Sequence, residues 1–365
     1  MAHGGGGSVR KIRVLVVDDS AILRKLITEA LRTDPEIEVV GTASNGKEAL
    51  RKVSLLRPDV ITLDIEMPVM DGLSALEKLR QVYPQGKVIM FSSLTEKGAQ
   101  ETIKALSLGA VDFATKPSSR SLKESLARIR EELIPKIKSV IPRALRGSVP
   151  QKAVKFHPLR QKEKRLLSFN VRREAVAIGV STGGPKALAE VIPKLPAHFP
   201  APILIVQHMP PLFTAQLASR LDQISPLKVV EASEGNPVVA GKVYVAPGDK
   251  HMEVTTRGGV KVIHLHKGPP ENSCRPAVDV LFRSVAKVFG AKSVGVVMTG
   301  MGHDGLAGAK SMKEKGAVIV AQDESTSVVY GMPRAVVEAG LADYVLPLGE
   351  IPNFLQKIFM QRIAA

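Results

Sequence analysis

The sequence predicts an α/β protein made of two doubly wound parallel-sheet domains, a flavodoxin-like one over residues 10–133 and a Rossmann-like one over residues 174–358. Its 365 residues are too many for one ordinary core and suit two domains of about 100 to 200 residues each. In both regions short apolar runs alternate with stretches of helical periodicity. Strands that are apolar on both faces and separated by helices favour parallel sheets. The composition, 44% hydrophobic, is that of a folded chain.

A basic tether is predicted between the domains, over residues 134–173. The chain carries 51 Lys and Arg against 35 Asp and Glu, a formal net charge of +16. Residues 140–173 alone hold 10 basic side chains and 1 acidic one, and prolines interrupt any long helix there. Because the excess charge sits in this segment, and because aromatic residues make up only 4% of the chain, we expect no nucleic-acid partner.

The sequence also predicts a cytoplasmic protein with no membrane insertion. Cys274 is the single cysteine, so no internal disulfide framework can form. No apolar run approaches the roughly 18 residues that a membrane span needs. The glycine-rich residues 1–9 contain no apolar core of a secretory signal.

The first domain is predicted to contain five strands, each followed by a helix. The apolar runs that predict the strands are 12–17, 39–40, 60–63, 88–91 and 110–113. The stretches with helical spacing are 20–31, 46–56, 73–82, 96–108 and 119–133. In such a sheet, binding and catalytic sites form beyond the carboxyl ends of the strands.

Polar residues follow these strands where they end. Asp18 and Asp19 follow the first strand, Asp64 the third, Ser92 the fourth and Lys116 the fifth. Three carboxylates at one sheet edge repel one another unless a hard divalent cation joins them, and Mg²⁺ suits oxygen ligands. Asp64 lies centrally among these residues, so its carboxylate is the one that remains available to react. Lys116 and the Ser92 hydroxyl can stabilise a phosphoryl group added to it.

This set of residues resembles the receiver domain of two-component response regulators. The resemblance implies phosphorylation of Asp64 by a histidine kinase. It assigns the Mg²⁺ site to Asp18, Asp19, Asp64 and the backbone carbonyl of Glu66. It assigns the phosphorylation switch to Ser92, which takes the place of the usual Thr, to Phe113 and to Lys116.

In the second domain a nucleophile turn is predicted after the strand at 175–180. Residues 179–183 read Gly-Val-Ser-Thr-Gly, which matches G-x-S-x-G between a strand and a helix. Such a turn exposes the hydroxyl of Ser181 and lets a substrate approach it. A phosphate bound at the helix N-terminus is the alternative. We rank it second because the glycine pattern of dinucleotide sites and the lysine of phosphate-binding loops are both absent.

A serine nucleophile needs a base and an orienting acid. His208 follows the strand at 203–206, and Asp304 follows the strand at 294–298. The order Ser…His…Asp differs from that of α/β-hydrolases. His303 is the rival base, but it adjoins Asp304 in sequence and fits a linear triad poorly. The backbone N–H of Met301 is a candidate oxyanion donor.

The second domain resembles the catalytic domain of the chemotaxis protein-glutamate methylesterase family. The matching segments are 179–184, 207–210, 275–282, 299–305 and 321–333. The resemblance makes Ser181 the nucleophile, His208 the base and Asp304 the orienting acid, with no cofactor in this domain. The family often has Asn at the position of His303, so the role of that residue stays open.

The resemblance implies hydrolysis of γ-glutamyl methyl esters on methyl-accepting chemoreceptors, with release of methanol, and deamidation of receptor glutamines. The implied phosphodonor is a chemotaxis histidine kinase, and we expect the unphosphorylated receiver to cover the Ser181 cleft. Two alternatives stay open: a receiver-controlled DNA-binding transcriptional regulator, and a receiver-gated esterase with a non-chemotaxis substrate. Against the first, the second domain lacks a helix-turn-helix pattern.

Overall fold

The computed structural model describes residues 10–117, 121–141 and 171–360. The chain divides into two compact units, Met1–Arg165 and Leu166–Ala365, and each is described by itself. Most of the predicted tether and the glycine-rich first nine residues lie outside the described residues. Within the described ranges, no helix is both long and apolar enough to cross a membrane.

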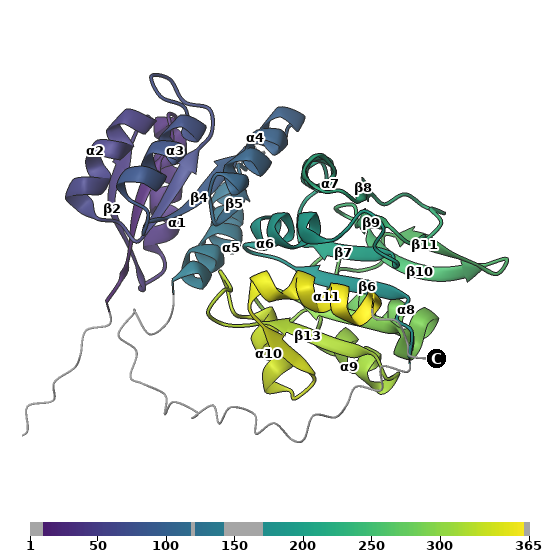
Figure 1. The fold of residues 1–365 in the computed structure, drawn as a ribbon. Helices are drawn as coiled ribbons and strands as arrows, with labels where there is room; N and C mark the ends of the chain where they lie inside the picture. Colours follow the sequence, from purple (N-terminus) through teal and green to yellow (C-terminus); the bar gives the residue numbers. More distant parts are fainter. Residues whose placement is uncertain (1–9, 118–120, 142–170, 361–365) are drawn as a thin grey trace, which may run out of the picture. The chain divides into compact units, whose positions relative to one another are not determined.

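The first unit contains a five-stranded parallel sheet with the strand order β2-β1-β3-β4-β5 (Figure 1). The strands are β1 (Ile12–Val17), β2 (Ile37–Ala43), β3 (Val60–Asp64), β4 (Lys87–Ser92) and β5 (Asp112–Thr115). The helices are α1 (Ala21–Arg32), α2 (Gly46–Leu56), α3 (Gly72–Val82), α4 (Glu96–Ser107) and α5 (Leu122–Val140). Helix α1 packs against α5, while α2, α3 and α4 pack in succession on the other face, so the sheet is doubly wound.

Polar caps fix where the helices of this unit begin. The side chain of the residue before each helix accepts a hydrogen bond from a backbone N–H three residues further on, which satisfies one of the unpaired donors of the first turn. The capping residues are Ser20, Asn45, Asp71, Thr95 and Ser121. Each capping residue therefore marks the point at which its helix begins.

Helix α5 differs from the prediction at its end. The sequence pattern predicts a helix that stops near residue 133 and a tether from 134, but α5 continues to Val140 with Pro135 inside it. Leu133, Ile137 and Val140 are buried with a helical spacing, and their packing stabilises the turns that follow the proline. Residues 134–140 are thus helical and do not belong to an extended tether.

The second unit contains a seven-stranded sheet with the order β14-β13-β12-β6-β7-β9-β8, in which every pairing is parallel. The strands are β6 (Ala175–Val180), β7 (Ile203–Gln207), β8 (Lys228–Glu231), β9 (Lys242–Val245), β12 (Ser293–Val297), β13 (Val318–Gln322) and β14 (Tyr344–Leu346). The predicted fold class, two parallel-sheet α/β domains, is confirmed.

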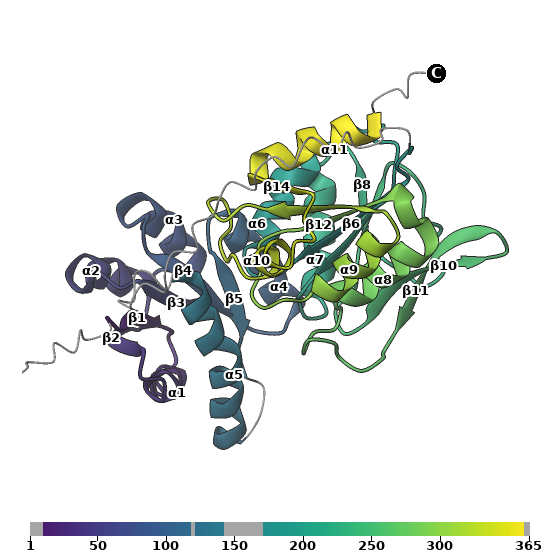
Figure 2. The same cartoon turned by 90° about the horizontal axis from the view of Figure 1, so that it is seen from below.

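Helices cover both faces of this sheet, with α6, α7 and α11 on one face and α8, α9 and α10 on the other (Figures 1 and 2). The helices are α6 (Gly184–Val191), α7 (Phe213–Ile224), α8 (Val278–Phe289), α9 (Leu306–Glu314), α10 (Met332–Glu338) and α11 (Ile351–Met360). The short 3₁₀ helices are η2 (Ile192–Lys194), η3 (Gly290–Lys292) and η4 (Leu348–Glu350).

An antiparallel hairpin, β10 (His251–Arg257) and β11 (Val260–His266), packs its first strand against α8. Figure 2 shows it beside that helix. This hairpin is not among the elements predicted from the sequence. Its signal is the pair Gly258-Gly259 between two alternating runs, and both glycines have the positive φ that a two-residue hairpin turn requires.

Candidate functional sites

An acidic cluster lies at the carboxyl edge of the five-stranded sheet. Strands β1 and β3 are neighbours, so Asp18, just after β1, comes close to Asp64 at the end of β3. Carboxylate oxygens of Asp18, Asp19 and Asp64 all lie within 4.8 Å of one another. The Lys116 Nζ atom is 2.7 Å from Asp64 Oδ2 and 3.3 Å from Asp18 Oδ2. The structure thus brings together four of the residues that we assign to this site.

Because two of these carboxylates are buried side by side, it is unfavourable for both of them to be ionised. Asp18 and Asp64 are 0% and 2% exposed. Burial, together with the charge of Asp18, raises the pKa of Asp64 to about 6 despite the ion pair with Lys116. Among the described residues, Asp18 Oδ2 and Asp64 Oδ2 accept no hydrogen bond beyond their ion pairs with Lys116. Buried oxygens with spare lone pairs fit a hard divalent cation such as Mg²⁺.

Ser92 and Phe113 lie near this edge, and the Ser92 carbonyl accepts a hydrogen bond from the Lys116 N–H at 2.7 Å. The Ser92 hydroxyl donates to the Gly98 carbonyl of helix α4 at 3.1 Å, and Phe113 is buried in β5. In this conformation the hydroxyl is therefore turned toward α4 and away from Asp64. A phosphoryl group on Asp64 would offer it a stronger, charged acceptor.

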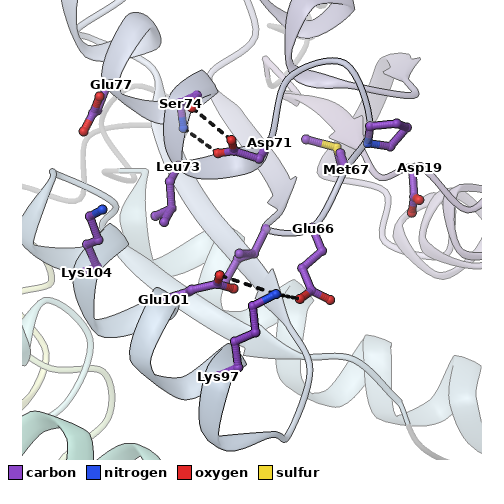
Figure 3. A pocket seen from close by; sticks show the side chains of 12 residues that line it. Asp19, Glu66, Met67, Asp71, Leu73, Ser74, Glu77, Lys97, Glu101 and Lys104 are labelled. Atoms are coloured by element: carbon purple, nitrogen blue, oxygen red, sulfur yellow. Dashed lines mark hydrogen bonds and ion pairs between the residues drawn. The ribbon is translucent and has the colours of Figure 1, made fainter.

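A pocket opens beside the cluster, between the loop after β3 and helix α4 (Figure 3). The Glu66 carboxylate points across it to Lys97, with Oε1 2.7 Å from Nζ, and Glu101 approaches the same ammonium at 3.9 Å. The Glu66 side chain therefore faces Lys97, and the ligand that we assign to the predicted metal site is the Glu66 backbone carbonyl.

In the second unit the turn after β6 presents Ser181. Strand β6 ends at Val180, and helix α6 begins at Gly184. The turn requires glycine twice: Gly183 has a φ of +79°, and a Cβ on Gly184 would lie 2.0 Å from Gln207 Oε1. The sharp turn places Ser181 beyond the end of the sheet, as the G-x-S-x-G pattern predicts.

Neighbouring strands bring the other two predicted residues to the same edge. Strand β7 pairs with β6, and the His208 N–H donates to the Val180 carbonyl at 3.1 Å. Strand β12 pairs with the opposite side of β6 and leads into the turn that carries Asp304, while the Ser181 N–H donates to Thr299 at the start of that turn. Residues from three distant segments therefore meet.

His208 and Asp304 form a pair, with Nε2 2.7 Å from Oδ2, in which Asp304 is buried and His208 is partly buried. Asp304 accepts five hydrogen bonds from the described residues. Oδ2 accepts from His208 and the Val278 N–H, and Oδ1 accepts from the Asn272 amide and from the N–H groups of Asp279 and Gly305. Although burial opposes ionisation, these donors hold the pKa of Asp304 below its usual range.

The environment of His208 favours its charged form. Burial alone would lower the pKa of this imidazole, but the contacts with Asp304 and Cys274 outweigh it and raise the pKa to about 9. Its second nitrogen, Nδ1, lies 3.5 Å from Cys274 Sγ. Because Nε2 is occupied by Asp304, Nδ1 is the atom left to accept a proton.

The serine hydroxyl is not joined to this pair. Among the described residues, Ser181 Oγ makes no hydrogen bond, to His208 or to any other group. Met301 is 43% exposed, and its backbone N–H has no partner in the described part of the chain, so it is available to an incoming oxyanion. His303 is exposed and contacts neither Ser181 nor His208 through its side chain, within the ranges described.

Four further residues support the site, and none of them is among the site residues predicted from the sequence. The Gln207 amide donates to the carbonyls of both Ser181 and His208, at 2.9 and 3.1 Å. Asp279, Asn272 and Cys274 surround the Asp–His pair. Gln207 and Asp279 lie inside the segments that carry the family resemblance, which is the one sequence signal that points to them.

The two units define a class of protein: a phosphoacceptor-type receiver joined to an α/β domain with a serine, a histidine and an aspartate at one sheet edge. The family model for the response regulator receiver domain matches residues 14–127, and that for CheB methylesterase matches residues 176–355. The chain belongs to the CheB methylesterase family. The predicted family and enzyme class are thereby confirmed.

Curated relatives match nearly the whole chain. A protein-glutamate methylesterase/protein-glutamine glutaminase of Pyrococcus abyssi is 50% identical over 94% of this chain and 92% of its own length. One of Pyrococcus horikoshii is 49% identical over 95% and 94%. Among solved structures, the CheB methylesterase catalytic domain of Thermotoga maritima is 47% identical, with a TM-score of 0.50, and covers 52% of this chain and 100% of its own.

Proposed function

We propose that the chain hydrolyses γ-glutamyl methyl esters of chemoreceptors to glutamate and methanol, and deamidates receptor glutamines with release of ammonia. The observation that carries this proposal is the His208–Asp304 pair, in which Nε2 lies 2.7 Å from the buried Asp304 carboxylate, beside the turn that exposes Ser181. The names of the relatives, which combine both activities, support the choice of substrate. Because that substrate is an intracellular receptor segment, we propose a cytoplasmic location.

In the proposed reaction Ser181 Oγ attacks the ester carbonyl, and His208 Nδ1 takes the hydroxyl proton. Asp304 accepts a hydrogen bond from the Nε2–H group throughout, so the imidazole keeps the tautomer that leaves Nδ1 basic. The hydroxyl and Nδ1 come together when substrate binds, since catalytic hydrogen bonds are often long in the free enzyme. His208 then returns the proton to the leaving methoxide, and methanol departs.

Water completes the cycle by attacking the acyl-serine, with His208 again as the base. The product is the glutamate side chain and free Ser181. A glutamine amide follows the same path with ammonia as the leaving group. The Met301 N–H, unpaired in the described part of the chain, is the proposed donor to the oxyanion, a contribution of roughly 3 kcal/mol to lowering the barrier.

Regulation is proposed to act through Asp64. Asp18, Asp19, Asp64 and the carbonyl of Glu66 would hold Mg²⁺, which neutralises phosphoryl charge when it is bound. Lys116, 2.7 Å from Asp64, would pair with the phosphoryl group, and Ser92 would turn from Gly98 to donate to it. Each tenfold of activation corresponds to about 1.4 kcal/mol of preference for the active state.

Methanol release from a methylated chemoreceptor tests the activity. The wild-type chain should release methanol after treatment with a small phosphodonor, and Ser181→Ala should not. Ser311→Ala, on an exposed turn of helix α9, is the matched control and should match wild type. No release by phosphorylated wild-type protein would overturn the substrate assignment.

Asp64→Asn tests the regulation separately. This variant should keep the basal rate and lose the response to the phosphodonor. Glu29→Gln, on helix α1, removes one carboxylate from the same unit and should respond like wild type. Activation of Asp64→Asn by the phosphodonor would contradict the proposed phosphorylation site.

A further inference from the structure

The loop between β11 and α8 places one amide between two buried carboxylates. The Asn272 Nδ2 atom donates to Asp304 Oδ1 and to Asp279 Oδ2, each at 2.9 Å. Both aspartates are 2% exposed. The two hydrogens of this amide are therefore both engaged, one by each carboxylate.

A tight turn presents this amide. Glu271 and Cys274 pair through two backbone hydrogen bonds of 3.0 and 2.9 Å, and the two residues between them, Asn272 and Ser273, have φ values of +51° and +61°. Two positive φ angles in a two-residue loop define a type I′ turn. Asn adopts this left-handed conformation more readily than most residues, so the side chain at this position is held by a backbone that suits it.

The other donors to these carboxylates are almost all backbone groups. Asp304 receives the N–H groups that open helix α8, at Val278 and Asp279, and Asp279 receives the Gly308 N–H of helix α9 at 2.6 Å. Burial and the charge of Asp304 raise the pKa of Asp279. A donor shared by both carboxylates offsets the repulsion between them and fixes their separation.

We propose that Asn272 is a positioning residue that holds the Asp304 carboxylate in the orientation in which Oδ2 faces His208. The inference rests on the proposed catalytic role of Asp304. Asn272 anchors Oδ1, so rotation of the carboxylate about its Cβ–Cγ bond would break this bond at the same time as the 2.7 Å contact with His208. The same turn carries Cys274, whose Sγ is 3.5 Å from His208 Nδ1, and so the turn touches both members of the pair.

The loop has other anchors, so loss of the amide leaves the loop in place. Glu271 forms a two-pronged ion pair with Arg283 of helix α8, with bonds of 2.6 and 2.5 Å. Arg275 binds Asp249 with Nε 2.9 Å from Oδ1. With these two ion pairs intact, the effect of changing Asn272 reports on Asp304 and not on the presence of the loop.

Two substitutions at this position separate the amide from the turn. Asn272→Gly removes the side chain and keeps a residue that tolerates positive φ. Asn272→Asp keeps the size and replaces the donor by a carboxylate. Ser273→Gly is the matched control, since it lies in the same turn and its side chain makes no hydrogen bond with the described residues.

We expect Asn272→Gly to lower kcat for methanol release about 10- to 100-fold, with KM within twofold of wild type, because a hydrogen bond to a charged group is lost. Asn272→Asp should lower kcat further. In Asn272→Gly the imidazole of His208 should titrate at lower pH in an NMR titration, because the Asp304 carboxylate that raises its pKa is no longer held with Oδ2 toward Nε2. The other groups around the pair, Cys274, Asp279 and Glu271, are unchanged.

Ser273→Gly should match wild type in kcat and in the His208 titration. The proposal is overturned if Asn272→Gly keeps kcat within twofold and leaves the His208 titration unmoved, or if Ser273→Gly loses as much activity as Asn272→Gly. Failure of the proposed function is distinguishable from either result, because the wild-type protein would then release no methanol while the NMR titration would still report on Asn272.

Discussion

Replacement of Asp304 by Asn is the sharpest test of the Asp–His pair. The substitution keeps the size of the side chain and exchanges one carboxylate oxygen for an NH₂ group. All five neighbours of the Asp304 carboxylate are donors, three at Oδ1 and two at Oδ2. The new amide keeps the largest number of hydrogen bonds when its oxygen occupies the Oδ1 position. Its NH₂ group then faces His208 Nε2 and the Val278 N–H.

His208 must then accept at Nε2, which moves its proton to Nδ1, the nitrogen that the proposed mechanism uses as the base. A wrong tautomer of this kind costs roughly 10⁴-fold in kcat in a Ser-His-Asp triad. The Val278 N–H, buried at the start of helix α8, also loses its acceptor, at a cost of about 1–3 kcal/mol in the free energy of unfolding.

The assay is kcat for methanol release by the phosphorylated protein, with urea denaturation measured in parallel. Asp279→Asn is the matched control: this carboxylate is equally buried, accepts from Asn272 and the Gly308 N–H, and does not touch His208. It should destabilise the protein by a similar amount and lower kcat by ~10-fold at most. An Asp304→Asn protein that is folded and keeps kcat within tenfold of wild type would refute the reasoning.

Four further predictions concern catalysis and stability as a function of pH, metal binding and the thiol. Because the base must be neutral and the pKa of His208 is raised to about 9, kcat/KM should climb from neutral pH and level off only above about pH 9; a plateau already reached by pH ~7 would contradict the assignment. Because the pKa of His208 is raised on folding, this residue contributes its whole stabilisation to the free energy of unfolding below pH ~6.5 and loses it as the pH rises through about 9. Urea denaturation across this pH range measures that loss. Mg²⁺ at 100 times its Kd should stabilise the first unit by ~2.7 kcal/mol, seen as a rise in the Tm that Asp18→Asn removes; a Tm that ignores Mg²⁺ would count against the site. Cys274→Ala should keep the esterase activity and lower the pKa of His208, because the Cys274 contact helps to raise it; loss of all activity would point to Cys274 as the nucleophile.

Much of the fold follows from apolar periodicity, because strands buried on both faces and separated by helices leave few arrangements other than a parallel sheet. The strand ends also follow, since Asp64, Ser181 and His208 each lie at or just after the last residue of an apolar run. Helix α5 was harder to delimit. Pro135 is a helix breaker in isolation, and only the packing of Ile137 and Val140 explains why the helix continues past it.

The details of the candidate site were less accessible from the sequence. A shared sheet edge predicts that Ser181, His208 and Asp304 meet, but not which nitrogen of His208 faces Asp304. Asn272 is 32 residues from Asp304 in sequence and reaches it through a turn whose geometry depends on two φ angles. Such contacts are set by side-chain directions in the folded chain, which periodicity does not encode.

The most direct test of the central claim is to identify the atom that carries the acyl group. Phosphorylated protein, mixed with a receptor peptide that contains a glutamyl methyl ester and quenched in acid, should carry the peptide acyl group on Ser181, with a mass equal to the peptide less methanol. Mass spectrometry of the digested chain locates that mass. An adduct on Cys274, or release of methanol by a Ser181→Ala protein that forms no adduct, would contradict the account.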